Sequence, residues 1–186
     1  MTRLTRLCRA LGVGLAVAAA TLSMTQLAYA DLAPPTLPAD SPLVAPSGSQ
    51  LFLIGHAKGV QIYTCNGNGD WGKSTPRANL FDDAGKLVVK HSGGPTWTAT
   101  ADNSAVLGTV VANVPSPSPA SAIPWLRLDT TPKDGAPVGL LTGTKTIQRV
   151  NTQGGVAPPK EDCTAKTANK AVEVSYRADY YFYKTA

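Results

Sequence analysis

AVEVSYRADYYFY, residues 171–183, is the stretch that decides the fold class of this 186-residue chain. Every second residue from Val172 to Phe182 is apolar or aromatic, and the residues between them are Glu173, Ser175, Arg177, Asp179, Tyr181 and Tyr183. Because successive side chains of a strand point to opposite faces, this alternation predicts a β-strand with one buried face. After residue 30 no window of ten or more residues has the periodicity of an amphipathic helix. The chain is therefore expected to be all-β.

Eight other short runs precede this stretch and have the composition of strands. They are rich in β-branched and aromatic residues and are separated by Gly, Pro, Asp and Asn. FDDAGK (81–86) is typical of a short hairpin loop, with Gly85 adopting a positive φ. About nine short strands without helices predict a single-domain antiparallel β-sandwich or barrel at residues 49–186. The eight runs are QLFLI, GVQIYTC, RANLF, KLVVKH, TWTAT, AVLGTVVANV, IPWLRLD and TKTIQRVN.

Residues 1–30 have the three parts of a cleaved secretory signal peptide. Arg3, Arg6 and Arg9 form a positive start, ALGVGLAVAAATLSM is a short apolar segment, and AYA (28–30) is a small-residue cleavage site. The apolar segment is shorter than a membrane-spanning helix requires, and an uncleaved anchor is the alternative. We expect a secreted, periplasmic or extracellular protein with no membrane association after cleavage. Five prolines in residues 31–48 predict an extended arm or linker.

Cleavage would also remove most of the positive charge of the chain. The formal net charge of the whole chain is +5, and losing the three arginines of the leader lowers it to +2. No run or stripe of Lys and Arg remains in the sequence after the leader. A nucleic-acid partner is therefore not expected.

Two cysteines, Cys65 and Cys163, remain after cleavage, because Cys8 lies in the leader. In an exported protein an even pair of cysteines predicts a disulfide bond. The alternative is a pair of metal-binding thiolates. It is less favoured because neither cysteine belongs to a C-x-x-C motif or lies beside a histidine.

The segment CNGNGDWGKS (65–74) matches two nucleotide-binding motifs. Its glycines fit G-x-G-x-x-G, and Gly67, Gly72, Lys73 and Ser74 fit G-x-x-x-x-G-K-S. Both motifs bind phosphate only where a helix follows the loop. Here Pro76 and the run RANLF indicate a turn followed by a strand. We therefore expect no nucleotide and no cofactor, and we interpret the segment as a surface turn beside the disulfide.

The two histidines that could bind a metal are His56 and His91. A zinc or copper site needs about three protein ligands, so aspartates would have to complete it, with Asp82, Asp83 and Asp102 as candidates. His91 shares the alternation of Leu87 and Val89, which favours a buried, hydrogen-bonded structural histidine. The metal site is therefore a weak alternative.

Tryptophans beside turns supply the positive indication of ligand binding. Trp71, Trp97 and Trp125 lie beside Gly or Pro, and Tyr181 and Tyr183 lie on the polar face of the last predicted strand. Such rings can stack on a sugar or another planar ligand, although tryptophans in a small domain usually anchor its core. His91, Trp97 and Trp125 are the candidate ligand-binding residues, and no pattern selects a catalytic residue.

Six segments in order resemble one family of exported bacterial and fungal proteins, domain of unknown function 3455. The resemblance spans about residues 51–184 and implies a single secreted domain with two well-placed cysteines and no established activity. No catalytic residues follow from it. The segments are GVQIYTC, GGPTW, IPWLRL, TIQRVNTQGGVAP, Cys163 with its surroundings, and YRADYYFY.

Three functional hypotheses follow from the sequence. The first is a secreted, disulfide-stapled binding or cell-surface-associated module, with a carbohydrate or another cell-surface ligand. The second is a secreted hydrolase that acts on a sugar or wall polymer through aspartates near His91 and Trp97. The third is a copper- or zinc-binding β-sandwich that uses His56 and His91.

We predict that the exported chain begins at Asp31. The Ala30→Arg substitution should block processing, because the peptidase requires a small residue at the cleavage point. Ala10→Val, a change away from that point, should leave processing intact. N-terminal sequencing and intact-mass measurement of the exported protein test this, and recovery of the wild-type chain at its full length would contradict it.

Overall fold

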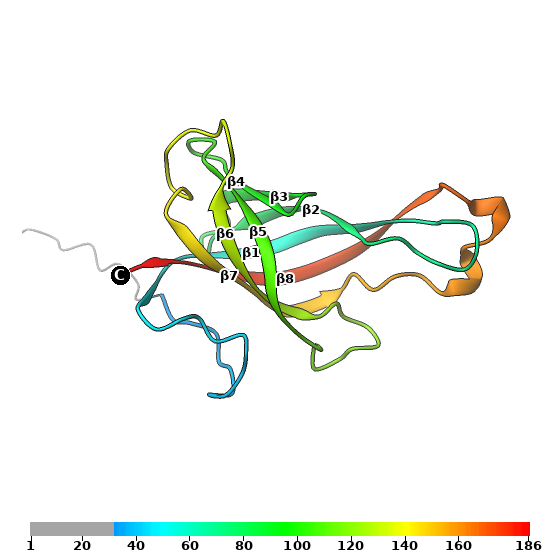
Figure 1. Ribbon diagram of the computed structural model, residues 1–186, viewed down its shortest axis with the longest axis horizontal. Coiled ribbons are helices and arrows are strands. Elements are labelled where there is room, and N and C mark those ends of the chain that lie inside the picture. Colours follow the sequence, from blue (N-terminus) through cyan, green and yellow to red (C-terminus); the bar gives the residue numbers. More distant parts are fainter. Residues whose placement is uncertain (1–31) are drawn as a thin grey trace, which may run out of the picture. The chain divides into compact units, whose positions relative to one another are not determined.

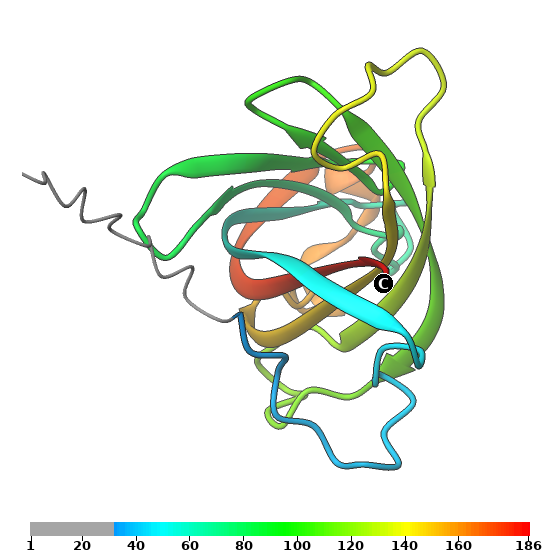
Figure 2. The ribbon, with the colours of Figure 1, turned by 90° about the vertical axis from the view of Figure 1, so that its left-hand side faces the viewer.

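Eight antiparallel strands close into a barrel in the computed structural model, which describes residues 32–186 (Figure 1). The leader expected at residues 1–30 lies outside the described residues. Each strand pairs with the next along the chain, and the last pairs with the first (Figure 2). The strands are β1 (Ser49–Thr64), β2 (Thr75–Phe81), β3 (Leu87–Ser92), β4 (Thr96–Ala99), β5 (Ala105–Val114), β6 (Trp125–Pro132), β7 (Thr144–Gly154) and β8 (Ala171–Thr185).

The all-β prediction is confirmed, and of its two architectures the structure has the barrel. Two short 3₁₀ turns, Lys160–Asp162 and Ala165–Thr167, are the helical elements of the described chain. Across residues 32–186 no helix has the length and apolarity needed to cross a membrane. Gly85 has a φ of 78° in the β2–β3 loop, as expected for the hairpin.

The count of strands differs from the predicted nine because QLFLI and GVQIYTC belong to one strand, β1. Gly59 looks like a break in the sequence, yet it lies in the middle of that strand. A Cβ atom at this position would collide with backbone atoms of Arg77 and Ala78 in β2. The glycine is there for the close approach of two backbones and not for a turn.

The barrel interior contains the side chains that the alternation predicts. Tyr176, Ala178, Tyr180 and Phe182 of β8 are all buried. Val172 belongs to the same predicted face but is 37% exposed. It lies in the part of β8 before Tyr176, which β7 does not pair with. The largest apolar contributions from other strands are Leu80, Val89, Trp97, Val106, Leu128 and Ile147.

Strands β1 and β8 extend beyond the barrel as a two-stranded ribbon (Figure 1). Their pairing runs from Ser49 opposite Thr185 to Thr64 opposite Ala171. Just past it, the predicted disulfide joins Cys65 to Cys163, with an S–S distance of 2.06 Å. The loop at 66–74 continues from Cys65 and leads into β2, so the chain after Pro76 is a strand and not a helix.

The proline-rich segment 32–48 lies against the outside of the barrel. Leu43 is 1% exposed, and its carbonyl accepts a hydrogen bond of 2.6 Å from Gln148 Nε2. Gln148 Oε1 in turn accepts a 2.7 Å hydrogen bond from the hydroxyl of Tyr183. The arm therefore buries Tyr183, which the strand alternation places on the polar outer face.

We predict that removing the disulfide lowers the free energy of unfolding substantially. The bond closes a span of 98 residues, and a loop of this size is worth about 4–5 kcal/mol in the chain-entropy model. Urea titration of a Cys65→Ala/Cys163→Ala double variant measures the difference. As a control, a reductant should lower the midpoint of the wild type and leave that of the variant unchanged; equal midpoints for the two proteins would refute the assignment.

Candidate functional site: a cavity in the barrel lumen

A cavity of about 610 Å³ lies inside the barrel, and all eight strands contribute to its wall. It lies toward the barrel end that carries the β1–β2, β3–β4 and β5–β6 connections, because residues of all three connections line it. We call this the cavity end. The lining residues are Gln61, Lys73, Ser74, Thr75, Pro76, His91, Gly94, Pro95, Trp97, Val110, Asn113, Pro124, Leu126, Leu128, Arg149 and Tyr180.

Three aromatic rings form a packed group at the cavity wall. His91 and Trp97, opposite each other on β3 and β4, stack with centroids 4.2 Å apart and an angle of 7° between the planes. Tyr180 presents its edge to both rings, at 5.4 Å from His91 and 6.0 Å from Trp97. The Trp97 ring lies over Gly108, where a Cβ atom would collide with it. These contacts hold the rings in one arrangement.

His91 is a neutral base in this arrangement. Its Nδ1 lies 2.9 Å from the carbonyl of Thr96, which can only accept, so Nδ1 carries the proton. Burial, and to a smaller extent the nearby charge of Arg149, lower the pKa of His91 to about 4. The imidazole is therefore uncharged near neutral pH.

Three of the lining side chains carry buried N–H donors without a protein partner in residues 32–186. The atoms are Gln61 Nε2, Trp97 Nε1 and Arg149 Nε. Two of these side chains each make a hydrogen bond through another of their polar atoms. Gln61 Oε1 accepts a 2.8 Å hydrogen bond from the hydroxyl of Ser74, and Arg149 Nη2 donates at 2.8 Å to the carbonyl of Pro124. Unpaired buried donors are uncommon in folded proteins, and a bound water or ligand that accepts from them would satisfy them.

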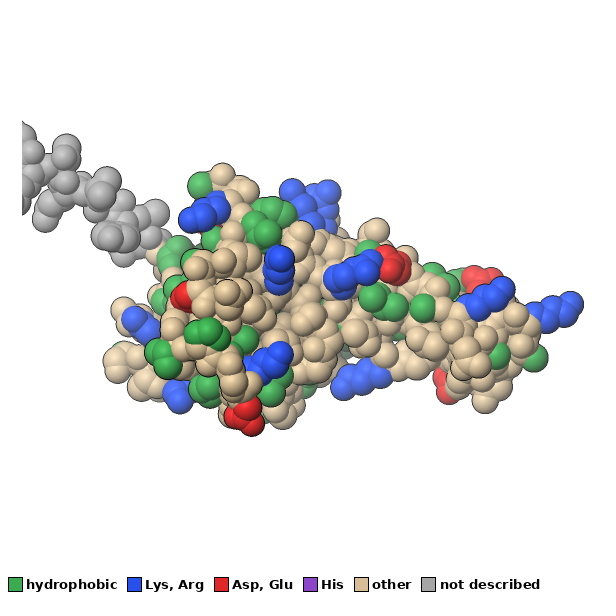
Figure 3. All heavy atoms as spheres, turned by 90° about the horizontal axis from the view of Figure 1, so that it is seen from above, with side chains coloured by type: hydrophobic (Ala, Val, Ile, Leu, Met, Phe, Trp, Pro, Cys, Tyr) green, Lys and Arg blue, Asp and Glu red, His purple; other side chains and the backbone are tan. Residues whose placement is uncertain are grey.

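The cavity is also electropositive. Lys73 and Arg149 line it, and no Asp or Glu does. In the described part of the chain the ion pairs are those of His56 with Asp83 and Asp179 and of Arg77 with Glu173, so neither lining cation has an acidic partner there. On the outer face seen in Figure 3, by contrast, basic side chains are scattered among polar ones.

The structure brings two of the three candidate ligand-binding residues together. His91 and Trp97 stack in the cavity wall, whereas Trp125 does not line the cavity. Its neighbours on β6, Leu126 and Leu128, do, and Trp125 precedes them with the opposite orientation.

Arg149 and Gln61 are two of the polar lining residues that the sequence analysis missed. Arg149 is two residues after Ile147, which is completely buried, so it continues an inward-facing alternation. A charged residue on the apolar side of a strand was the available signal.

His56 lies on the other side of the barrel wall. Its Nε2 is 2.7 Å from Asp83 Oδ1 and its Nδ1 is 2.7 Å from Asp179 Oδ1. The hydrogen bonds to Asp83 and then to Asp179 raise its pKa. His56 and His91 thus face opposite sides, and no cluster of three His, Cys, Asp or Glu suited to a metal ion occurs between residues 32 and 186. The geometry gives the metal hypothesis no support.

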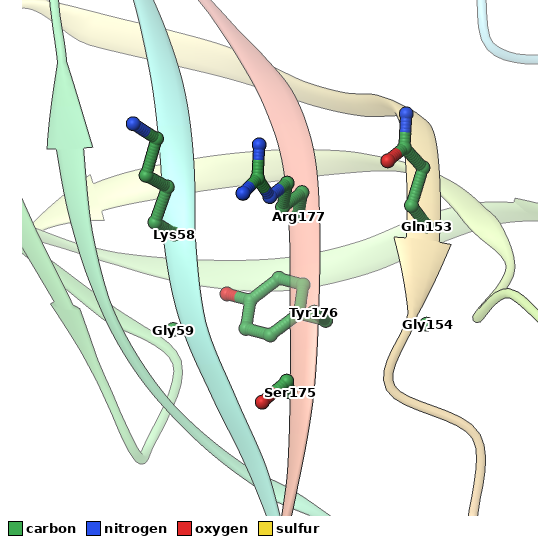
Figure 4. A pocket seen from close by; sticks show the side chains of 7 residues that line it. All are labelled: Lys58, Gly59, Gln153, Gly154, Ser175, Tyr176 and Arg177. Carbon is green, nitrogen blue, oxygen red and sulfur yellow. The ribbon is translucent and has the colours of Figure 1, made fainter.

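A shallower hollow of about 390 Å³ lies on the outside of the barrel (Figure 4). Lys58 and Arg177 line it from the neighbouring strands β1 and β8, and Gln153 lines it from β7. Neither this hollow nor the lumenal cavity contains a carboxylate. The hydrolase hypothesis, which needs paired acids, therefore has no support from these two sites.

The fold and the site define an eight-stranded antiparallel barrel with an electropositive lumenal cavity. The chain belongs to the family described as "Protein of unknown function (DUF3455)", whose model matches residues 46–184. A comparison with curated proteins gave no match. A comparison with solved structures gave none either.

We predict that His91 makes the protein lose stability as the solution becomes acidic. Its pKa is about 4 in the folded state and 6.5 when unperturbed, so the unfolded chain binds the proton first. The contribution of neutral His91 to the free energy of unfolding is complete above pH 6.5. About 3 kcal/mol of it is lost as the pH falls toward 4. Urea titrations between pH 7 and 4 measure it.

His91→Phe keeps a ring against Trp97 and should flatten this acid slope. His56→Gln should keep the slope, because the pKa of His56 is raised and its stabilisation is lost toward alkaline pH instead. Equal slopes in the wild type and His91→Phe would rule out a neutral buried His91.

Proposed function

We propose that the domain binds a small molecule inside the barrel. The observation that carries this proposal is the cavity lined by all eight strands, beside which three lining side chains have buried donors without partners. Unpaired buried N–H groups cost free energy, and a ligand that accepts from them would recover it. This is the binding hypothesis of the sequence, with the lumen proposed as the ligand site.

The dimensions of the barrel support the same proposal. Eight strands give an interior that side chains either fill or leave just wide enough for one small ligand. Here side chains fill the part around Leu80, Val89, Val106 and Phe182. The remaining 610 Å³ falls within the usual range of small-molecule pockets, about 300–1,000 Å³.

We further propose that the domain works outside the cytoplasm. The pattern of residues 1–30 and the cysteine pair support export. A disulfide-stapled barrel open at one end suits a carrier or sensor of a small molecule in that compartment. No step of chemistry is assigned to it.

The neutral probe N-phenyl-1-naphthylamine, which becomes fluorescent on leaving water, tests the lumen as a binding site. We expect saturable binding to the wild type. Val110→Trp should weaken it about tenfold or more, because Val110 lines the cavity and a tryptophan there fills it. Thr109→Trp is the matched control, since Thr109 precedes Val110 on the same strand, is exposed like it and does not line the cavity.

The two histidines locate the probe independently. NMR signals of the His91 ring, in the cavity wall, should shift on titration, and those of His56, on the outer face, should not. Loss of binding in both tryptophan variants, or a shift of the His56 signals alone, would place the probe outside the lumen and refute the proposal.

A further inference from the structure

We infer that the lumenal ligand is an anion: a small molecule with an apolar or aromatic body and an acidic group that binds to Arg149. The acidic group is a carboxylate, sulfonate or phosphate, which share the oxygen acceptors that a guanidinium recognises. The inference rests on the proposed function and adds the chemical class of the ligand.

The first argument is the uncompensated charge of Arg149. This side chain is only partly exposed, lies among Leu126, Tyr180 and Gln61, and has no acidic partner in the described chain. A partly buried cation without a counter-ion is unfavourable, and an anionic ligand supplies that counter-ion. The positive charge of Arg149 also acts on a neighbouring group, since it contributes to the lowered pKa of His91.

The second argument is the kind of hydrogen-bonding group left unsatisfied. Gln61 Nε2, Trp97 Nε1 and Arg149 Nε are all donors. Ionised acidic groups offer acceptors only, so they match such a set. The cavity has no carboxylate that would repel an anion.

The third argument is the arrangement of charge and apolar surface. Lys73 precedes β2 in the β1–β2 loop, while Val110, Leu126 and Leu128 provide the aliphatic wall. An anion meets a positive entrance and then a positive interior, while its body contacts the aliphatic residues. His91, being neutral, neither adds to this field nor opposes it.

A pair of probes that differ in one charged group tests the inference. 8-Anilino-1-naphthalenesulfonate is N-phenyl-1-naphthylamine with an added sulfonate, so the two share the same aromatic body. We expect the sulfonate to bind the wild type about tenfold more tightly than the neutral probe, the size of effect that a hydrogen-bonded charge provides.

Arg149→Met should remove this preference while changing the affinity for the neutral probe less than about twofold. Arg149→Lys should keep part of it, because the charge remains and the fork geometry is lost. Arg177→Met is the matched control: it deletes an exposed arginine of the outer hollow and should leave both affinities unchanged.

The outcomes separate the inference from the proposed function. If the neutral probe binds in the lumen and the sulfonate binds no more tightly, or if Arg177→Met removes the preference, the ligand is not an anion held by Arg149. If neither probe shifts the His91 signals, the proposed function itself fails. Should Arg149→Met not fold, Arg149→Lys replaces it, and a preference that this variant keeps undiminished would overturn the inference.

Discussion

The pairing of β1 with β8 is the constraint on which the rest of the structure depends. It joins the first and last strands of the domain over their whole length and turns an open sheet into a closed wall. Closure leaves neither strand with an unpaired edge, and it creates an interior. The register of this pairing, with Ala57 opposite Ala178 and Gly59 opposite Tyr176, fixes which side chains of these two strands face inward.

The interior then divides into two parts with different physical roles. Around Leu80, Val89 and Phe182 it is an ordinary apolar core. Toward the cavity end it holds Gln61, His91 and Arg149, groups whose burial opposes folding unless they are paired. A barrel built only for stability would place apolar side chains there, so these three polar side chains fit the proposed ligand site.

Much of the fold followed from the sequence because strand alternation is a local property. The alternation in residues 171–183 predicted which side chains of β8 enter the barrel, and Pro76 predicted that a strand follows the glycine-rich loop. The continuity of β1 through Gly59 could not be predicted. In a sequence, a glycine that allows the close approach of a neighbouring backbone looks the same as a glycine that makes a turn.

Only part of the candidate site could be predicted from the sequence, because contacts between strands are not a local property. His91 and Trp97 were found as individual residues beside turns, but their stacking depends on the β3–β4 register, which no local pattern states. Arg149 was not selected, although it continues the inward-facing alternation of Ile147. Its importance arises from the absence of any acid around it, and an absence in three dimensions leaves no trace in a single sequence.

The covalent link at the tip of the β1–β8 ribbon has a consequence for access to the interior. The loop that carries Lys73 and Ser74 to the cavity begins at Cys65, and the amide of Gly69 donates to the carbonyl of Cys163 at 2.8 Å. The bond therefore restrains one side of the entrance as well as the fold. In a reducing compartment the strands would keep their hydrogen bonds, while the loop at 66–74 would lose its covalent restraint. Under the proposed function, the oxidation state of two sulfur atoms therefore bears on how readily a ligand enters and leaves.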